Sequence, residues 1–231
     1  MIYDIHSHLL PWVDDGSPSM EDSVQLVRDQ IEDGITKIIF TPHYRLDWFH
    51  ESKERLTVVY GEMLEALDKE GISIPTSLAM EAHDDPQMLR EVVEGRVLTL
   101  SDNGHFLLEL DWRNHNENIV NDVEEYIRNG FTPVIVHYER FLYKSMDEVL
   151  GMRDAGALFQ VNAYSLLAAE SENNRDFAMR MINDGVADFI ATDYHLGKFR
   201  KTVEAYSLVA ERFGEAKRDA LFRDNAEKLF G

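Results

Sequence analysis

The chain has 231 residues, with 43 acidic and 23 basic side chains and a formal net charge of −20. Such an acidic surface repels bare nucleic acid and anionic membranes, so neither is an expected partner. The absence of cysteine excludes disulfides, thiolate metal sites and every mechanism with a cysteine nucleophile. The sequence shows no signal peptide and no apolar run near the roughly 20 residues of a membrane span. We therefore expect a cytoplasmic protein without membrane insertion.

Short apolar runs alternate with amphipathic helical segments along the chain. The apolar runs predict strands near residues 2–6, 37–40, 77–80, 106–110, 133–136, 157–161 and 188–191. A capping box at Ser19 predicts a first helix that ends before Gly34, with Met20, Val24, Val27 and Ile31 on its apolar face. Further helices are predicted at 52–70, 117–129, 146–154, 175–183 and 202–213, with short helical pieces after residue 214.

This alternation of strands and helices predicts right-handed βαβ units and a parallel sheet. About seven units without a linker or repeat break favour one closed, barrel-like α/β domain over residues 1–231. A doubly wound open sheet is the alternative. Two long connections, 9–18 and 41–51, follow the first two strands, and we expect them to frame a cleft.

The first strand ends in a pattern typical of a metal site, Asp4-Ile5-His6-Ser7-His8. Residues two apart in a strand point to the same side, so His6 and His8 can bind one ion together. The preceding Asp4 suits an acceptor that fixes an imidazole tautomer.

Other predicted strands also end in histidine or carboxylate residues, and functional groups of parallel α/β folds gather at these ends. In chain order they are His6, His8, His43, Glu81, Glu109, His137, Asp193 and His195. Asp14-Asp15-Gly16 adds a carboxylate pair after the first strand, although either aspartate could be a turn former. The remaining histidines, His50, His83, His105 and His115, are interpreted as loop or helix-flanking residues.

Mixed imidazole and carboxylate ligands without thiolate suit Mn, Fe or Zn. The candidates are too many for one ion, whereas two or three ions bridged by a carboxylate such as Glu81 would use them all. A site of this type binds phosphate oxygens and supplies hydroxide at neutral pH, which indicates phosphoester or amide hydrolysis. The competing interpretation of Glu109, within Leu107-Leu108-Glu109-Leu110, is a buried carboxylate paired with an arginine.

Several further motifs are distributed along the chain. They are residues 1–8, 13–16, Thr41-Pro42-His43, Leu107-Leu108-Glu109, 133–137 with Glu139-Arg140, Gln160-Val161-Asn162, 190–195, and 220–222 with Asn225. Through these motifs the sequence resembles, over essentially the whole chain and in order, the manganese-dependent protein tyrosine phosphatases of bacterial capsule and exopolysaccharide operons. These belong to the polymerase and histidinol phosphatase (PHP) superfamily.

The resemblance implies a distorted (β/α)7 barrel that holds three divalent ions, with Mn(II) expected and Fe or Zn possible. The implied ligands are His6, His8, Glu81 and Asp193 for the first ion, Glu81, Glu109 and His137 for the second, and Asp15, His43 and His195 for the third. Asp15 is chosen over Asp14 because the family's ligand directly precedes the glycine. Arg140 and Arg200 match phosphate-binding positions, and Arg140, His43 and Asp193 are the expected catalytic residues. We expect Tyr44, Tyr138 and Tyr194 near the mouth of the pocket.

The expected reaction is attack of a metal-bridging hydroxide on phosphotyrosine, without a phosphoenzyme. A tyrosine leaving group, with a pKa near 10, departs with little protonation. The family implies the tail of a bacterial tyrosine kinase as substrate, with Lys198, Arg200 and Lys201 as a basic docking patch. The alternatives are a PHP-type phosphoesterase for a small metabolite such as histidinol phosphate, a non-catalytic regulatory barrel, and an amidohydrolase without the usual carbamylated lysine.

Overall fold

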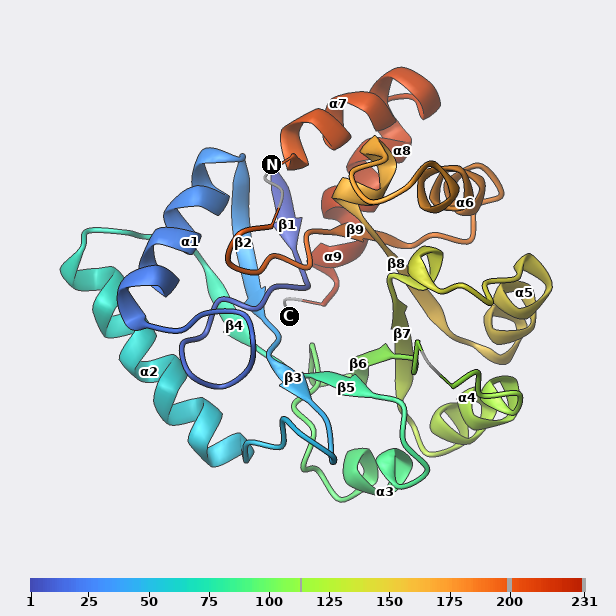
Figure 1. Cartoon of the computed structure of the whole chain (residues 1–231), viewed down its shortest axis with the longest axis horizontal. Helices are drawn as coiled ribbons and strands as arrows, with labels where there is room; N and C mark the ends of the chain where they lie inside the picture. Colours follow the sequence, from blue (N-terminus) through green and yellow to red (C-terminus); the bar gives the residue numbers. More distant parts are fainter. Residues whose placement is uncertain (113, 199–200, 230–231) are drawn as a thin grey trace.

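The computed structural model describes residues 1–112, 114–198 and 201–229, with strands at the centre and helices around them (Figure 1). The strands are β1 (Ile2–Asp4), β2 (Ile35–Phe40), β3 (His43–Tyr44), β4 (Thr76–Leu78), β5 (Glu81–His83), β6 (His105–Glu109), β7 (Thr132–Val136), β8 (Leu158–Asn162) and β9 (Phe189–Ala191). The α-helices are α1 (Met20–Glu32), α2 (Lys53–Lys69), α3 (Met88–Val93), α4 (Ile119–Arg128), α5 (Met146–Ala155), α6 (Glu172–Asn183), α7 (Thr202–Phe213), α8 (Glu215–Asp219) and α9 (Asn225–Glu227). Two 3₁₀-helices, η1 (Tyr138–Arg140) and η2 (Ala163–Leu167), and one π-helix, η3 (Ala220–Asp224), complete the described helical segments.

The described strands form two parallel sheets. The smaller sheet has the order β1-β2-β4, and the larger has the order β3-β5-β6-β7-β8-β9. Every pairing within them is parallel, from β1 with β2 to β8 with β9. The prediction of an α/β fold with parallel strands is therefore confirmed, and parallel strands direct all their carboxyl ends to one edge.

Two predicted strands are each interrupted, which explains why the observed strands outnumber those expected. Residues 41–42 separate β2 from β3, and residues 79–80 separate β4 from β5. Hydrogen bonds to neighbours continue through the gap, since Thr41 N–H donates to Ser7 O at 2.8 Å and Glu81 N–H to Pro42 O at 3.0 Å. Beyond the interruptions, His43 and Glu81 lie opposite each other in the β3–β5 pair.

The end of β1 is hydrogen-bonded on both sides. Besides the bond from Thr41, Asp193 N–H donates to His6 O at 2.9 Å and His8 N–H donates to Tyr194 O at 3.0 Å. Ser7 and Tyr194 accordingly form an isolated parallel bridge between the two sheets. These bonds bring the segments after β1, β2 and β9 together, and the described residues have no continuous ladder between β1 and β9.

Two hydrophobic clusters stabilise this arrangement. The larger cluster includes Leu26, Val59 and Met181 and joins the strands to the helices around them. The smaller cluster is formed mainly by strand residues from both sheets, together with three residues of connections and, near the C-terminus, Ala226 and Leu229. Side chains of both sheets therefore share one apolar interior beneath the strand ends.

Most helix predictions are correct within a few residues. Ser19 caps α1 as predicted, because its side chain accepts a hydrogen bond from Asp22 N–H. The prediction that Ile31 lies on the buried apolar face is wrong, since this residue is 39% exposed. Helix α3 was not predicted, because six residues are too few to show a repeating helical pattern of apolar side chains. No helix within the described residues is both long and apolar enough to cross a bilayer.

Candidate metal centre

The structure brings all the predicted metal ligands together. Among the described residues, four overlapping groups have ligand atoms within 4.8 Å of one another: His8, Asp15, His43 and His195; His6, His8 and Asp193; His6, Glu81 and His137; and His43, Glu81 and Glu109. We call these nine side chains the ligand cluster. None of the other four histidines belongs to these groups.

Glu81 occupies the centre of the ligand cluster. Its side chain is fully buried, with Oε1 3.2 Å from His6 Nε2 and 3.0 Å from His137 Nε2. Its second oxygen, Oε2, lies 3.2 Å from His8 Nε2 and 2.8 Å from His43 Nδ1. Burial opposes ionisation of this carboxyl, but the imidazoles outweigh it and hold its pKa well below the ordinary value. Glu81 is thus placed to bridge neighbouring cations.

The rings of His6 and His8 face each other through their Nε2 atoms, which are 3.1 Å apart. His6 Nδ1 donates to Gln160 Oε1 at 3.0 Å, and His8 Nδ1 donates to an aspartate oxygen at 2.8 Å. With hydrogen on both Nδ1 atoms, neutral rings would direct two lone pairs at each other. A shared cation relieves this repulsion. Without one a proton takes its place: burial disfavours the charged ring, but Glu81 and Asp193 raise the pKa of His6 to about 9.

The aspartate that orients His8 is Asp14, whose buried Oδ2 also accepts from His43 N–H. Its other oxygen accepts from Gly16 N–H at 2.9 Å. A Cβ on Gly16 would lie 2.1 Å from His8 O, so only glycine allows this loop to pack on the first strand end. Asp14 therefore fixes the ring, which is the role expected for Asp4.

The prediction that Asp4 fixes an imidazole is wrong. Its side chain accepts hydrogen bonds from the N–H and hydroxyl of Thr192 and the side chain of Gln30. Asp4 and His6 are two positions apart, about 6.6 Å along an extended chain, so the carboxylate lies one layer below the rings. It instead joins the end of β9 to β1.

Gln160 and Asn162 were not predicted as functional residues, although both lie at the end of β8. Gln160 Nε2 donates to Asn162 Oδ1 at 2.7 Å, which turns the other amide atom, Oε1, toward His6. Asn162 Nδ2 in turn donates to Asp193 Oδ2 at 3.0 Å. The signal in the sequence was the polar pair in a buried apolar strand, where an unpaired amide is costly.

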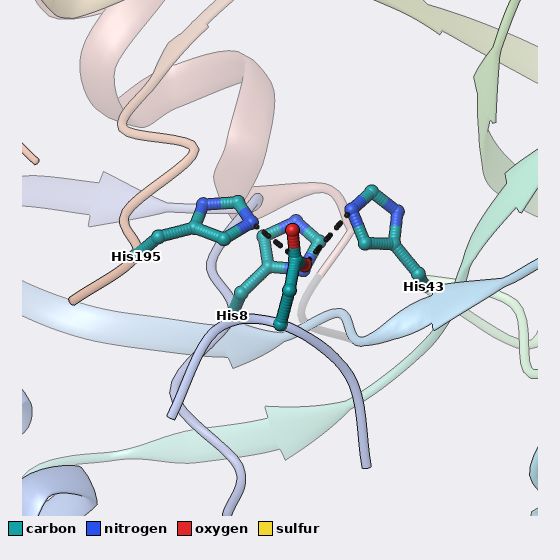
Figure 2. A group of neighbouring side chains, drawn as sticks. His8, His43 and His195 are labelled. Atoms are coloured by element: carbon teal, nitrogen blue, oxygen red, sulfur yellow. Dashed lines mark ion pairs between the residues drawn. The ribbon is translucent and has the colours of Figure 1, made fainter. Parts of the chain in front are cut away.

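Asp15 and three imidazoles form the outer part of the ligand cluster, and Figure 2 shows His8, His43 and His195 converging from the segments that follow β1, β2 and β9. Asp15 Oδ1 lies 3.6 Å from His43 Nε2 and 3.5 Å from His195 Nε2. The Asp15 side chain is 61% exposed, unlike the fully buried Asp14. An exposed carboxylate between two ring nitrogens is suited to an ion that solvent can reach.

Glu109 lies at the edge of the cluster, 3.8 Å from His137 Nε2 and 3.9 Å from His43 Nδ1. Arg45 Nη1 is also 3.9 Å away, so the arginine considered as an alternative partner is present, but at the limit of an ion pair. Burial and repulsion from Glu81 raise the pKa of Glu109 to about 7. Neutralising both carboxylates requires more positive charge than Arg45 provides at this distance.

Asp193 links the ligand cluster to Arg140. Its Oδ2 accepts three bonds of 3.0 Å, from Arg140 Nη1, Asn162 Nδ2 and the Tyr164 hydroxyl. Its Oδ1 faces the imidazoles, 3.8 Å from His6 and 3.7 Å from His8. Burial opposes ionisation, but nearby imidazoles and Arg140 hold the pKa of Asp193 well below its ordinary value. Its backbone is left-handed, with φ 51°, a strained conformation typical of functional sites.

Arg140 is the predicted phosphate-binding residue that the structure describes, and its side chain is 30% exposed. Its Nε donates to Glu170 at 3.2 Å, so two carboxylates hold the guanidinium plane beside the ligand cluster. Arg200, the second predicted phosphate-binding residue, lies outside the described residues. Of the other basic residues considered, Lys198 lines the site and Lys201 pairs with Glu204 at 3.8 Å.

The expectation that Tyr44, Tyr138 and Tyr194 lie at the mouth of the pocket is wrong. Each is at most 5% exposed. Their hydroxyls donate to Glu91, Glu148 and Asp29 respectively, carboxylates on helices. Each tyrosine directly adjoins a predicted ligand in the sequence, but these hydroxyl contacts direct its side chain toward a helix and away from the ligand cluster.

Two clefts open onto the ligand cluster, and both include Glu109, His137 and Arg140 in their walls. One, of about 220 Å³, is further lined by Asp15, His43, Arg45, Trp48, Phe49, Asp193, His195 and Lys198. The other, of about 340 Å³, is lined by Trp112, Phe141 and Glu170. A larger cleft of about 860 Å³ involves α6 and α7 and includes none of the ligand cluster.

The distances in the ligand cluster fit divalent ions. Atoms that bind one ion at about 2.1 Å with angles between about 90° and 110° are about 3.0–3.4 Å apart. The separations of His6 from His8, 3.1 Å, and of His137 from Glu81, 3.0 Å, lie in this range. In addition, His43 Nδ1, Glu81 Oε2 and Glu109 Oε2 are buried but make no hydrogen bond to any described residue. Imidazole and carboxylate ligands of this kind suit Mn, Fe or Zn.

Fold and site together define an α/β protein whose parallel strands carry a candidate metal centre at their carboxyl ends. The comparisons with known proteins specify the family. The model of the capsular polysaccharide synthesis family CpsB/CapC matches residues 2–231. The chain therefore belongs to the CpsB/CapC family.

Relatives in this family are named as phosphatases. The chain is 25% identical to tyrosine-protein phosphatase CpsB of Streptococcus pneumoniae, over 98% of this chain and 97% of the relative. It is 26% identical to tyrosine-protein phosphatase YwqE of Bacillus subtilis, over 98% and 90% of the two chains. A putative tyrosine-protein phosphatase CapC of Staphylococcus aureus is 25% identical, over 83% and 76%.

A solved structure of this family has the same fold. It comes from work on YwqE of Bacillus subtilis and CpsB of Streptococcus pneumoniae, described as metal-dependent tyrosine phosphatases. Its TM-score is 0.92 at 25% identity, covering 99% of this chain and 94% of that one. An organophosphorus hydrolase mutant, with TM-score 0.62 and 10% identity over 100% and 92% of the chains, shares only the fold.

Proposed function

We propose that this chain is a metal-dependent protein tyrosine phosphatase that needs no cysteine. The observation that carries this proposal is the convergence of nine ligand-type side chains beside Arg140, at the edge where all strands end. The relatives named tyrosine-protein phosphatases support it. We further propose one domain over residues 1–231, located in the cytoplasm.

The proposed ligands form three sets, for which Mn(II) is the proposed ion and Fe or Zn are alternatives. They are His6, His8, Glu81 and Asp193; Glu81, Glu109 and His137; and Asp15, His43 and His195. His43 faces Glu81 through Nδ1 and Asp15 through Nε2, so it lies between the second and third sets. Divalent ions held there would act as Lewis acids and would lower the pKa of bound water, so that hydroxide is available as the nucleophile near neutral pH.

The proposed architecture is a distorted (β/α)7 barrel. In support, β2 with β3 and β4 with β5 act as single interrupted strands, which reduces nine strands to seven positions. The bonds of residues 6–8 to residues 193–194 join the first and last strands. Strand residues from both sheets also pack in one interior cluster.

The protein side chains position the substrate. Arg140 lines both clefts, and its forked donors suit phosphoryl oxygens, whose negative charge its guanidinium would stabilise. Asp193 and Glu170 hold that guanidinium in plane. A tyrosine oxygen, with a pKa near 10, leaves with little protonation, whereas a serine alkoxide would need a dedicated acid. This favours aryl phosphate esters.

The proposed substrate is a phosphotyrosine protein, specifically the tail of a bacterial tyrosine kinase that controls capsule or exopolysaccharide synthesis. The family's description as capsular polysaccharide synthesis supports this biological setting. The proposed dephosphorylation would regulate that synthesis.

The test compares phosphate release from a phosphotyrosine peptide, the matching phosphoserine peptide and histidinol phosphate. Each is assayed with metal-stripped protein, with Mn-reconstituted protein and with the Arg140→Ala variant. We expect Mn-dependent release from phosphotyrosine, reduced about 10²- to 10³-fold in the variant, because a donor to the developing charge is lost. Because Arg140 also donates to the proposed ligand Asp193, bound metal is measured in the variant and the rates are compared at saturating Mn(II).

Two outcomes contradict the proposal. Faster hydrolysis of histidinol phosphate than of phosphotyrosine would assign the chain to metabolite phosphoesterases. Full metal occupancy without release from any of the three substrates would indicate a regulatory, non-catalytic protein. Arg175→Ala, a change at an arginine of α6 whose side chain is 36% exposed, is the matched control and should leave all rates unchanged.

A further inference from the structure

The tryptophans of this protein are unusually exposed. The sequence has three, and Trp12, Trp48 and Trp112 are 53%, 70% and 53% exposed. A tryptophan is usually mostly buried, because its large apolar surface is costly to hydrate. Each lies in a connection after a strand, in 9–18, 41–51 and the segment after β6. Exposed tryptophans are typical of surfaces whose energetics are dominated by a few aromatic contacts.

Trp48 ends a stack of rings that begins in the ligand cluster. The ring of Phe49 lies 5.9 Å from that of His43, at an interplanar angle of 11°. Trp48 stacks on Phe49 at 4.9 Å and 8°. Both aromatic residues line the smaller cleft. An apolar wall thus runs from a proposed metal ligand outward to solvent.

Trp112 lines the other cleft, which shares Glu109, His137 and Arg140 with the first. Phe141, with 3% of its surface exposed, contributes to the same cleft. Trp48 and Trp112 are therefore in separate clefts that meet at Arg140. We call Trp48, Phe49 and Trp112 the aromatic rim.

The charges around the aromatic rim favour an anionic occupant. Arg45 and Lys198 line the smaller cleft with Arg140, and the three carboxylates in its lining, Asp15, Glu109 and Asp193, are proposed metal ligands whose charge bound ions would neutralise. These cations attract a phosphoryl group inward. The chain that carries the phosphoryl group must then leave along the clefts, past exposed aromatic faces.

We propose that Trp48 and Trp112 bind the polypeptide flanking a phosphotyrosine, one tryptophan in each cleft. This inference rests on the proposed phosphatase function and identifies the residues that select a peptide over a small ester. The rings supply flat apolar contact area at low conformational cost, as aromatic residues do in other peptide-binding sites. Phe49 keeps Trp48 in place by stacking beneath it.

The experiment compares two substrates of the Mn-loaded protein, a phosphotyrosine peptide and phenyl phosphate, in Trp48→Ala and Trp112→Ala variants. We expect KM for the peptide to rise roughly tenfold in each variant, with kcat little changed. The kcat/KM for phenyl phosphate should stay within about twofold. Trp48→Phe and Trp112→Phe should restore most of the peptide affinity because they keep an aromatic face.

A binding measurement separates this inference from the proposed function. Fluorescence anisotropy gives the Kd of a labelled peptide that carries a non-hydrolysable phosphonate in place of the phosphate. The Kd should rise roughly tenfold in the alanine variants. It should not change in Val58→Ala, which alters a side chain on α2 that is 54% exposed. This readout does not require turnover.

Two results would overturn the role of the aromatic rim: equal losses on peptide and phenyl phosphate, or unchanged peptide KM and Kd in both alanine variants. If the wild-type protein hydrolyses neither substrate, the proposed function fails, and the Kd values still decide whether the tryptophans bind the peptide. Metal content, measured for every variant, should equal that of the wild type because neither tryptophan belongs to the ligand cluster.

Discussion

The ligand cluster and the aromatic rim lie at the same ends of the strands, but they differ in burial and in partners. Glu81 is fully buried among four imidazoles, and His6 is oriented by Gln160. Trp48 and Trp112 are 70% and 53% exposed and lie on connections. Fixed geometry suits the chemistry, which tolerates little displacement, whereas accessible rings suit recognition of a chain of varied sequence. The two regions should therefore respond differently to substitution.

The largest effect is expected for Glu81→Gln. The change removes a buried negative charge between four imidazoles, so two of the proposed ion sets lose their shared ligand. We expect at least a hundredfold weaker metal binding and at least about 10³-fold slower release from phosphotyrosine. Metal content by plasma emission and phosphate release measure the two effects. Glu65→Gln, at a side chain 76% exposed, is the control, and retained metal and rate in Glu81→Gln would contradict the bridging role.

Metal affinity should also depend on pH. In the metal-free protein burial opposes protonation, but Glu81 and neighbouring carboxylates raise the pKa of His6 to about 9 and that of His43 to about 10. Both rings are then protonated near pH 8 and must lose a proton to bind metal. Affinity should therefore fall as the pH falls, by up to about tenfold per pH unit for each proton.

Titration calorimetry at about pH 8 in two buffers of different protonation enthalpy measures the protons released. The expected value approaches two, one each from His6 and His43. Binding without proton release would show that both rings are neutral in the metal-free protein.

A smaller effect is expected one layer behind the ligands. Gln160→Leu removes the acceptor of His6 Nδ1 and the donor to Asn162 while keeping a similar volume. Loss of such an orienting partner typically weakens metal binding 10- to 100-fold. Equilibrium dialysis against Mn(II) measures it. The exposed Gln25→Leu change on α1 is the control, and an unchanged affinity in Gln160→Leu would mean that the strand alone orients the ring.

The smallest effect concerns stability and the aromatic rim. Trp48→Ala should change the free energy of unfolding by no more than about 0.5 kcal/mol, because an exposed side chain leaves no cavity. Urea denaturation of the metal-free protein measures this change. A loss of several kcal/mol would show that Trp48 supports the fold and would weaken its assignment to recognition.

The sequence alone predicted the parallel α/β fold, because strands and helices alternate in regular blocks with recognisable ends. It also indicated most side chains of the ligand cluster, since they lie at or just after the ends of apolar runs, whereas Asp15 was chosen over Asp14 because of the family resemblance. The sequence also predicted that these side chains lie close together, because parallel strands have their carboxyl ends at the same edge of a sheet. The interruptions at 41–42 and 79–80 were not predicted, because they depend on how the strands pair.

Residues that act through another residue were harder to predict. Asp4 and Asp14 are both near histidines in sequence, and only the loop conformation that Gly16 permits shows that Asp14 orients His8. Gln160 is 154 positions from His6, so no local pattern connects them. The exposure of Trp48 and Trp112 likewise required the structure, because an aromatic residue in a connection can be either buried or exposed.

The most direct test of the ligand cluster is anomalous diffraction from crystals grown with Mn(II), recorded near the manganese absorption edge. The account predicts anomalous peaks within bonding distance of His6, Glu81 and His43, with Glu81 contacting more than one of them. A single peak away from Glu81, or none in the cluster of a protein that still releases phosphate from phosphotyrosine, would contradict it.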